Sequence, residues 1–149
     1  MTGKADFTAE EWEQVLQGPT SAGMIVVTAE RGGSIRESFS MATSYTEARK
    51  AHGDSELLDE IVSHKPEMDH TRYHSAEEMK VASLEHLRAA VELVKAKASE
   101  QELDEYRRFI VNLAQGVAEA HKEGFMGMSG ERVSDAEREA IQEVEAALA

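Results

Sequence analysis

The segment SEQELDEYRRFIVNLAQGVAEAHKEG, residues 99–124, decides the fold class. Its apolar residues recur every three or four positions, so they share one face of a helix. Ser99 and Glu102 form a capping box, in which each side chain satisfies a backbone N–H at the helix start. Gly124 stands where a left-handed cap would end the helix. The predicted inward face carries Leu103, Tyr106, Ile110, Leu113, Val117 and Ala120.

The same helix-start signal occurs four more times along the chain. The pairs are Thr8/Glu11, Ser34/Glu37, Ser75/Glu78 and Ser134/Glu137. Each stands at the head of a segment with helical apolar spacing, and no segment alternates as a half-buried strand would. The sequence therefore predicts an all-α protein, residues 1–149, folded as a compact single-domain bundle of about seven helices.

The other expected helices follow from the same spacing. After Ser75 the apolar stripe consists of Val81, Leu84, Leu87, Val91, Val94 and Ala98. Shorter helices are expected at residues 9–17, after Ser34, around residues 57–62 and after Ser134.

Residues 20–29 are ambiguous, because Ile25, Val26, Val27 and Thr28 are β-branched and a short buried strand would show the same pattern. Helix is favoured, since no second strand is available for pairing and Pro19 suits the first position of a helix. A separate helix is therefore expected here, after the one at residues 9–17.

Composition narrows the classes of function. Sixteen Lys and Arg against 29 Asp and Glu give a net charge of −13, which disfavours nucleic acid and anionic lipid as partners. The chain contains no cysteine, which excludes disulfides, thiolate metal sites and cysteine nucleophiles. The longest apolar run, Met24 to Val27, is too short for a membrane span, and no signal segment follows Met1. We expect a soluble cytoplasmic protein with a frayed end at residues 1–6.

Two stretches carry a family resemblance. GERVSDAEREAI, residues 130–141, and AERGGSIRE, residues 29–37, resemble the loop-to-helix signature of the tellurite-resistance TerB-like domains, which are compact helical bundles. The family's loop opens with Asp-Gly, whereas Gly32 and Ser129 occupy the Asp position here. The resemblance implies a bacterial module that acts in a stress response. Because the family's loop acids are associated with divalent cations, it also implies the candidate ligands Glu30, Glu37, Glu131 and Glu137.

A second candidate metal site lies within the eleven residues 64–74, where possible ligands are densest. Imidazole and carboxylate groups suit Zn²⁺, Ni²⁺ or Fe²⁺. Pro66, Thr71 and the cap at Ser75 equally indicate a polar connecting loop in which these side chains are only solvated. The candidate ligands are His64, Glu67, Asp69, His70 and His74.

No spacing typical of a catalytic nucleophile and its base is present, and an enzyme pocket would have to combine dispersed residues such as Tyr45, His86, Tyr106 and Arg107. The leading hypothesis is therefore a non-enzymatic helical module that works through a protein partner or self-association. The alternative is a protein that binds a divalent cation through the acidic loops or the His64–His74 cluster.

Overall fold

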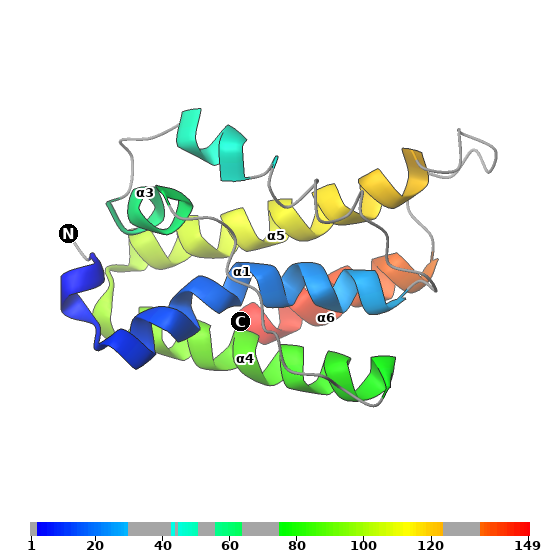
Figure 1. Ribbon diagram of the computed structural model, residues 1–149, viewed down its shortest axis with the longest axis horizontal. Helices are drawn as coiled ribbons and strands as arrows, with labels where there is room; N and C mark the ends of the chain where they lie inside the picture. Colours follow the sequence, from blue (N-terminus) through cyan, green and yellow to red (C-terminus); the bar gives the residue numbers. More distant parts are fainter. Residues whose placement is uncertain (1–2, 30–42, 44, 51–55, 64–74, 124–134) are drawn as a thin grey trace.

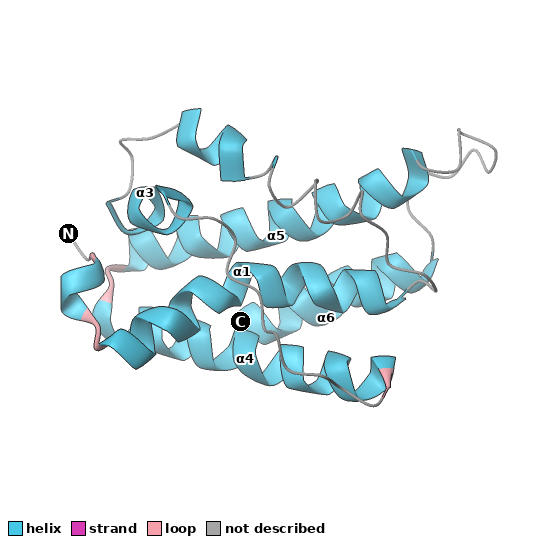
Figure 2. Ribbon diagram, viewed as in Figure 1, coloured by secondary structure: helices cyan, strands magenta, loops and turns pink. Residues whose placement is uncertain are grey.

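The computed structural model describes residues 3–29, 43, 45–50, 56–63, 75–123 and 135–149. Within these ranges every regular element is helical and no strand occurs (Figure 2). The prediction of an all-α bundle is confirmed, and the number of helices is close to the one expected. The elements are the 3₁₀ helix η1 (Lys4–Asp6), α1 (Ala9–Ala29), α3 (Glu56–Ser63), α4 (Ala76–Lys97), α5 (Glu100–Glu123) and α6 (Asp135–Leu148), with further helical residues at 45–50.

Four long helices form the bundle. Figure 1 shows α1 running between α4 and α5, and α1 packs against α4, α5 and α6. The short α3 packs on α5 near the end of the bundle where η1 lies (Figure 1). The buried apolar side chains of the described residues form one cluster. The largest fully buried members are Val15, Ile25, Val26, Tyr45, Leu57, Ile61, Val62, Leu87, Tyr106, Ile110 and Leu113.

Helix α1 is continuous through Pro19, so the prediction of two helices was wrong. Proline has no N–H, which leaves the carbonyl of Val15, four residues earlier, without its helical donor. The hydroxyl of Tyr106 on α5 donates to that carbonyl over 2.7 Å. Burial raises the pKa of Tyr106 well above its ordinary value, which keeps the hydroxyl protonated as a donor. A bond from another helix thus lets α1 continue through Pro19 without ending.

Gly18 makes the approach of Tyr106 possible. A Cβ atom at this position would lie 2.1 Å from the Tyr106 Oη and 2.9 Å from the Ala90 Cβ. Both distances are shorter than van der Waals contact, so a side chain here would displace the tyrosine or the helix. Gly18 therefore allows α1 to sit close to both α4 and α5.

The start of α4 is as predicted, and its inward stripe is as predicted except at Val81. The Ser75 hydroxyl caps the helix by accepting from the Glu78 N–H over 3.1 Å. Leu87, Val91 and Val94 are buried as expected, whereas Val81 is 52% exposed. At 3.6 residues per turn Val81 lies about 120° from Leu87 around the helix, outside the stripe centred on Leu87 and Val91. The inclusion of Val81 in the core was therefore wrong.

Helix α5 matches its predicted face, and α6 follows Ser134 as expected. The Glu102 N–H donates to the Ser99 hydroxyl over 3.2 Å, and five of the six residues proposed for the inward face of α5 are buried, the side chain of Ala120 lying outside the description. On α6, Val144 and Leu148 are buried. Ser34, Glu37, Gly124 and Ser134 also lie outside the described residues. Among the helices that are described, none is both long and apolar enough to cross a bilayer.

Candidate functional site

A hollow of about 530 Å³ lies on the surface between α1 and α4. Its size falls in the range of sites that accept a small molecule or a protein side chain. The residues that line it are Glu10, Glu13, Gln14 and Gln17 of α1 and Glu85, His86 and Ala89 of α4.

Helical periodicity explains this lining. The four α1 residues are spaced i, i+3, i+4 and i+7, so they share one face, while Trp12, Val15 and Leu16 are buried in the core. Across the hollow, Ala89 follows Glu85 by one helical turn, and its methyl group leaves space that a longer side chain would fill. The hollow is the gap between two polar faces whose helices pack through their apolar sides.

The hollow is strongly acidic. Glu10, Glu13 and Glu85 are all exposed, and His86 and Gln17 are half-buried between them. Neither lysine nor arginine is among the lining residues. Three carboxylates around one concave surface create a negative potential that attracts a cationic group, and the two glutamine amides add donors and acceptors that can orient it.

The predicted metal ligands do not form this hollow. Glu137 alone falls within the described residues, where it lies in the first turn of α6, is 2% exposed and takes part in an interaction inside the protein. Within the described part of the chain, no three His, Asp or Glu side chains form a group able to hold a metal ion. The other candidates, Glu30, Glu37, Glu131, His64, Glu67, Asp69, His70 and His74, lie outside the described residues.

The dispersed residues considered for an enzyme pocket occupy different places. Tyr106 is bonded to α1, and Tyr45 is buried with its ring edge-on to Phe109 at 5.2 Å between centroids. The Arg107 Nε–H donates to the Leu148 carbonyl over 2.6 Å, which ties α5 to the end of α6. Among the four, His86 alone lines the hollow.

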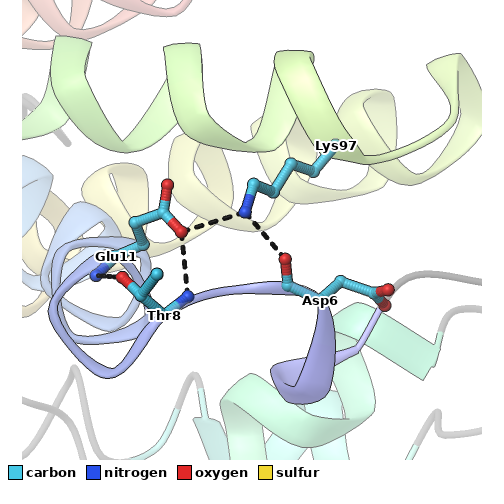
Figure 3. Close-up of polar contacts among 4 residues, drawn as sticks. All are labelled: Asp6, Thr8, Glu11 and Lys97. Atoms are coloured by element: carbon cyan, nitrogen blue, oxygen red, sulfur yellow. Dashed lines mark hydrogen bonds and ion pairs between the residues drawn. The ribbon is translucent and has the colours of Figure 1, made fainter.

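A second polar centre lies at the start of α1 (Figure 3). The Lys97 ammonium, in the last turn of α4, donates to the Asp6 carbonyl over 2.8 Å and to the Glu11 Oε1 over 2.9 Å. Glu11 also completes the predicted capping box, because its carboxylate accepts from the Thr8 N–H while its own N–H donates to the Thr8 hydroxyl. Lys97 therefore joins the end of α4 to the start of α1.

Residues 4–6, for which a frayed end was expected, form η1 beside this lysine. The Gly3 N–H donates to the Asp6 carboxylate over 2.8 Å, and the Lys4 N–H donates to Glu60 of α3. Phe7 follows, 8% exposed, with its ring centroid 5.8 Å from that of Trp12. The segment is thereby connected to both α3 and α4.

The charge of Glu11 should make the stability of the protein depend on pH. The Thr8 N–H, and next the Lys97 ammonium, lower the pKa of Glu11 below its ordinary 4.5. A carboxylate whose pKa is lower in the folded state stabilises the fold above its unfolded-state pKa, and this contribution is lost as the pH falls through the folded-state value.

We therefore expect Glu11→Gln, which keeps a capping oxygen, to reduce the free energy of unfolding at neutral pH. The difference from the wild type should shrink as the pH falls below 4.5. Urea unfolding across this range measures it. Glu119→Gln, on an exposed part of α5, is the control that removes one charge elsewhere. A difference that grows in acid would contradict the assignment.

The sequence pattern alone does not identify most of the residues that line the hollow. The polar spacing of residues 10, 13, 14 and 17 is visible in the printed chain, but it is equally typical of an ordinary solvated helix face. His86 stands among the dispersed residues of the sequence, and two of its three acidic neighbours, Glu10 and Glu13, come from a helix about 70 residues away. Only the packing of α1 on α4 brings the two faces together.

Comparisons of the chain with known protein families, curated proteins and solved structures find no match.

Proposed function

We propose that this chain is a non-enzymatic helical module that works through protein–protein contacts, and that the acidic hollow between α1 and α4 receives a positively charged segment of its partner. The observation that supports this is the grouping of Glu10, Glu13 and Glu85 around one concave surface. The net charge of −13 extends the attraction beyond the hollow and favours rapid encounter with a basic partner.

A protein partner fits the lining better than a second copy of the chain. Two such hollows facing each other would bring six glutamates together, and like charges oppose association. Self-association through another surface would leave the hollow free, and light scattering would report the mass of the particle.

We also propose that the module works in the bacterial cytoplasm as part of a stress response. The resemblance to the TerB-like domains supports a bacterial stress response, and the absence of cysteine fits a cytoplasmic location, where thiols stay reduced.

The test is a titration of the protein with a deca-lysine peptide, followed by nuclear magnetic resonance. We expect shifts at residues of the hollow, and we expect Glu13→Gln/Glu85→Gln to weaken binding about fivefold, the effect of two exposed ion pairs. Glu119→Gln/Glu139→Gln removes two exposed charges from α5 and α6 and serves as the matched control. Equal weakening by both double variants would show that only net charge matters, and would refute the hollow as the site.

The alternative, a divalent-cation site, is tested by calorimetry on metal-stripped protein. Ca²⁺ or Mg²⁺ binding that Glu137→Gln abolishes would favour the acidic loops, since these ions prefer oxygen ligands. Zn²⁺ or Ni²⁺ binding that is weaker at pH 5.5 than at pH 7.5, and is lost in His70→Ala, would favour the histidine cluster, because imidazole must be deprotonated to bind.

A further inference from the structure

The segment before α1, residues 3–7, depends on the rest of the protein for its position. Its only regular structure is the three-residue 3₁₀ helix η1. So short a helix is not stable alone, because nucleation costs more than one or two hydrogen bonds return. The contacts made by α3 and α4 therefore decide whether the segment stays in place.

The segment is held by the buried Phe7 ring, which packs on Trp12, and by a few polar contacts that involve charged groups. On one side Glu60 of α3 accepts from the Lys4 N–H. On the other side the Lys97 ammonium donates to the Asp6 carbonyl and lies 5.3 Å from the centroid of the Phe7 ring. The same ammonium bonds Glu11 at the first turn of α1. One cation thus makes two of the contacts that hold the segment against the bundle and also joins α4 to the start of α1.

The Lys97 bridge is within reach of water. The side chain of Lys97 is 33% exposed and that of Glu11 is 27% exposed. At such exposure, ions in solution screen the attraction and water competes for the ammonium. The bridge is therefore breakable under conditions that leave the apolar core intact.

Beneath the segment lies Trp12, whose indole N–H would gain a hydrogen bond to water if the segment moved away. Trp12 is 4% exposed, and its indole N–H meets no hydrogen-bond acceptor among the described residues. A buried donor without an acceptor destabilises the closed arrangement, whereas water would accept from an exposed indole. Opening is thus favoured by the indole N–H and opposed by Lys97 and by the burial of the Phe7 ring.

We propose that residues 3–7 form a releasable clasp, which covers Trp12 while the Lys97 ammonium bridges Asp6 and Glu11 and swings away when that bridge is broken. The helices α1, α4, α5 and α6 keep their packing in the open state, because Phe7 is the one residue of the clasp whose side chain belongs to the buried core. Opening uncovers the aromatic pair Phe7 and Trp12 at one end of the bundle.

Trp12 is the single tryptophan of the chain, so its fluorescence reports on this place alone. Lys97→Gln removes the charge, Lys97→Arg keeps it, and Lys95→Gln removes an exposed charge from the same last turn of α4. We expect acrylamide to quench Trp12 more strongly in Lys97→Gln than in the wild type and the other two variants. Far-ultraviolet circular dichroism should be the same for all four proteins.

Chymotrypsin supplies a second readout, because cleavage after the buried Phe7 requires the clasp to open. When opening and closing are fast, the cleavage rate follows the open population, and we expect the fragment that begins at Thr8 to form about tenfold faster in Lys97→Gln. The free energy of global unfolding should fall by no more than in Glu11→Gln, which breaks the same Lys97–Glu11 pair.

The proposal is overturned if quenching and cleavage in Lys97→Gln equal those of Lys95→Gln. If Lys97→Gln fails to fold, quenching of Trp12 is measured in the wild type at low and high salt. Raising the salt concentration from about 0.01 M to about 1 M shortens the Debye length from about 30 Å to about 3 Å, which weakens the Lys97 bridge and should increase quenching. Unchanged quenching at high salt would then overturn the clasp.

Discussion

Replacing Gly18 with alanine is expected to lower the free energy of unfolding by about 2–3 kcal/mol, although alanine is the better helix former. The added Cβ would lie 2.1 Å from the Tyr106 Oη, so the tyrosine must move and its bond to the Val15 carbonyl is strained or lost. Chemical denaturation followed by circular dichroism measures the change.

A double-mutant cycle with Tyr106→Phe separates the causes. Tyr106→Phe alone should cost about 1–3 kcal/mol, because it leaves the Val15 carbonyl without a donor beside Pro19. In that background Gly18→Ala meets no hydroxyl, and its nearest neighbour becomes the Ala90 Cβ at 2.9 Å. The two losses should therefore sum to more than the loss in the double variant. Additivity within about 0.5 kcal/mol would mean that the hydroxyl is not what Gly18 accommodates.

Truncation of the α5 core should have an effect at least as large. Ile110 and Leu113 have no exposed surface, and each change to alanine should cost about 2–5 kcal/mol through lost burial and the cavity that remains. Asn112, exposed on the same helix between them, is the matched control and should change stability by less than about 0.5 kcal/mol when replaced by alanine. Losses at both core positions no larger than that of the control would mean that the wrong face of α5 has been placed inward.

Local signals in the sequence were sufficient to predict most of the helices. The capping box at Thr8 and the caps at Ser75 and Ser99 involve residues three apart, so no distant partner is needed to form them. The inward face of α5 was predicted for the same reason, because a regular apolar spacing leaves a single way to bury the helix.

The errors arose where a distant residue decides the local structure. Pro19 predicts a helix start by its own chemistry, and only a tyrosine 91 residues from Val15 allows α1 to continue through it. The acidic hollow likewise requires two polar faces that tertiary packing alone places opposite each other. Val81 is an error of another kind, because its position about 120° from Leu87 around the helix already lies outside the α4 stripe.

The central position of α1 has a consequence for biosynthesis. This helix leaves the ribosome ahead of α4, α5 and α6, yet those are the helices against which it packs. Among the described helices α4 contributes most of the contacts to α1, so the apolar face with Val15, Ile25 and Val26 stays incompletely covered until α4 and then α6 have been made. Contacts between segments so far apart in sequence form slowly, and exposed apolar surface invites aggregation in the meantime. The nascent chain is thus most exposed to misassembly, and most in need of a chaperone, between the synthesis of its first long helix and that of its last.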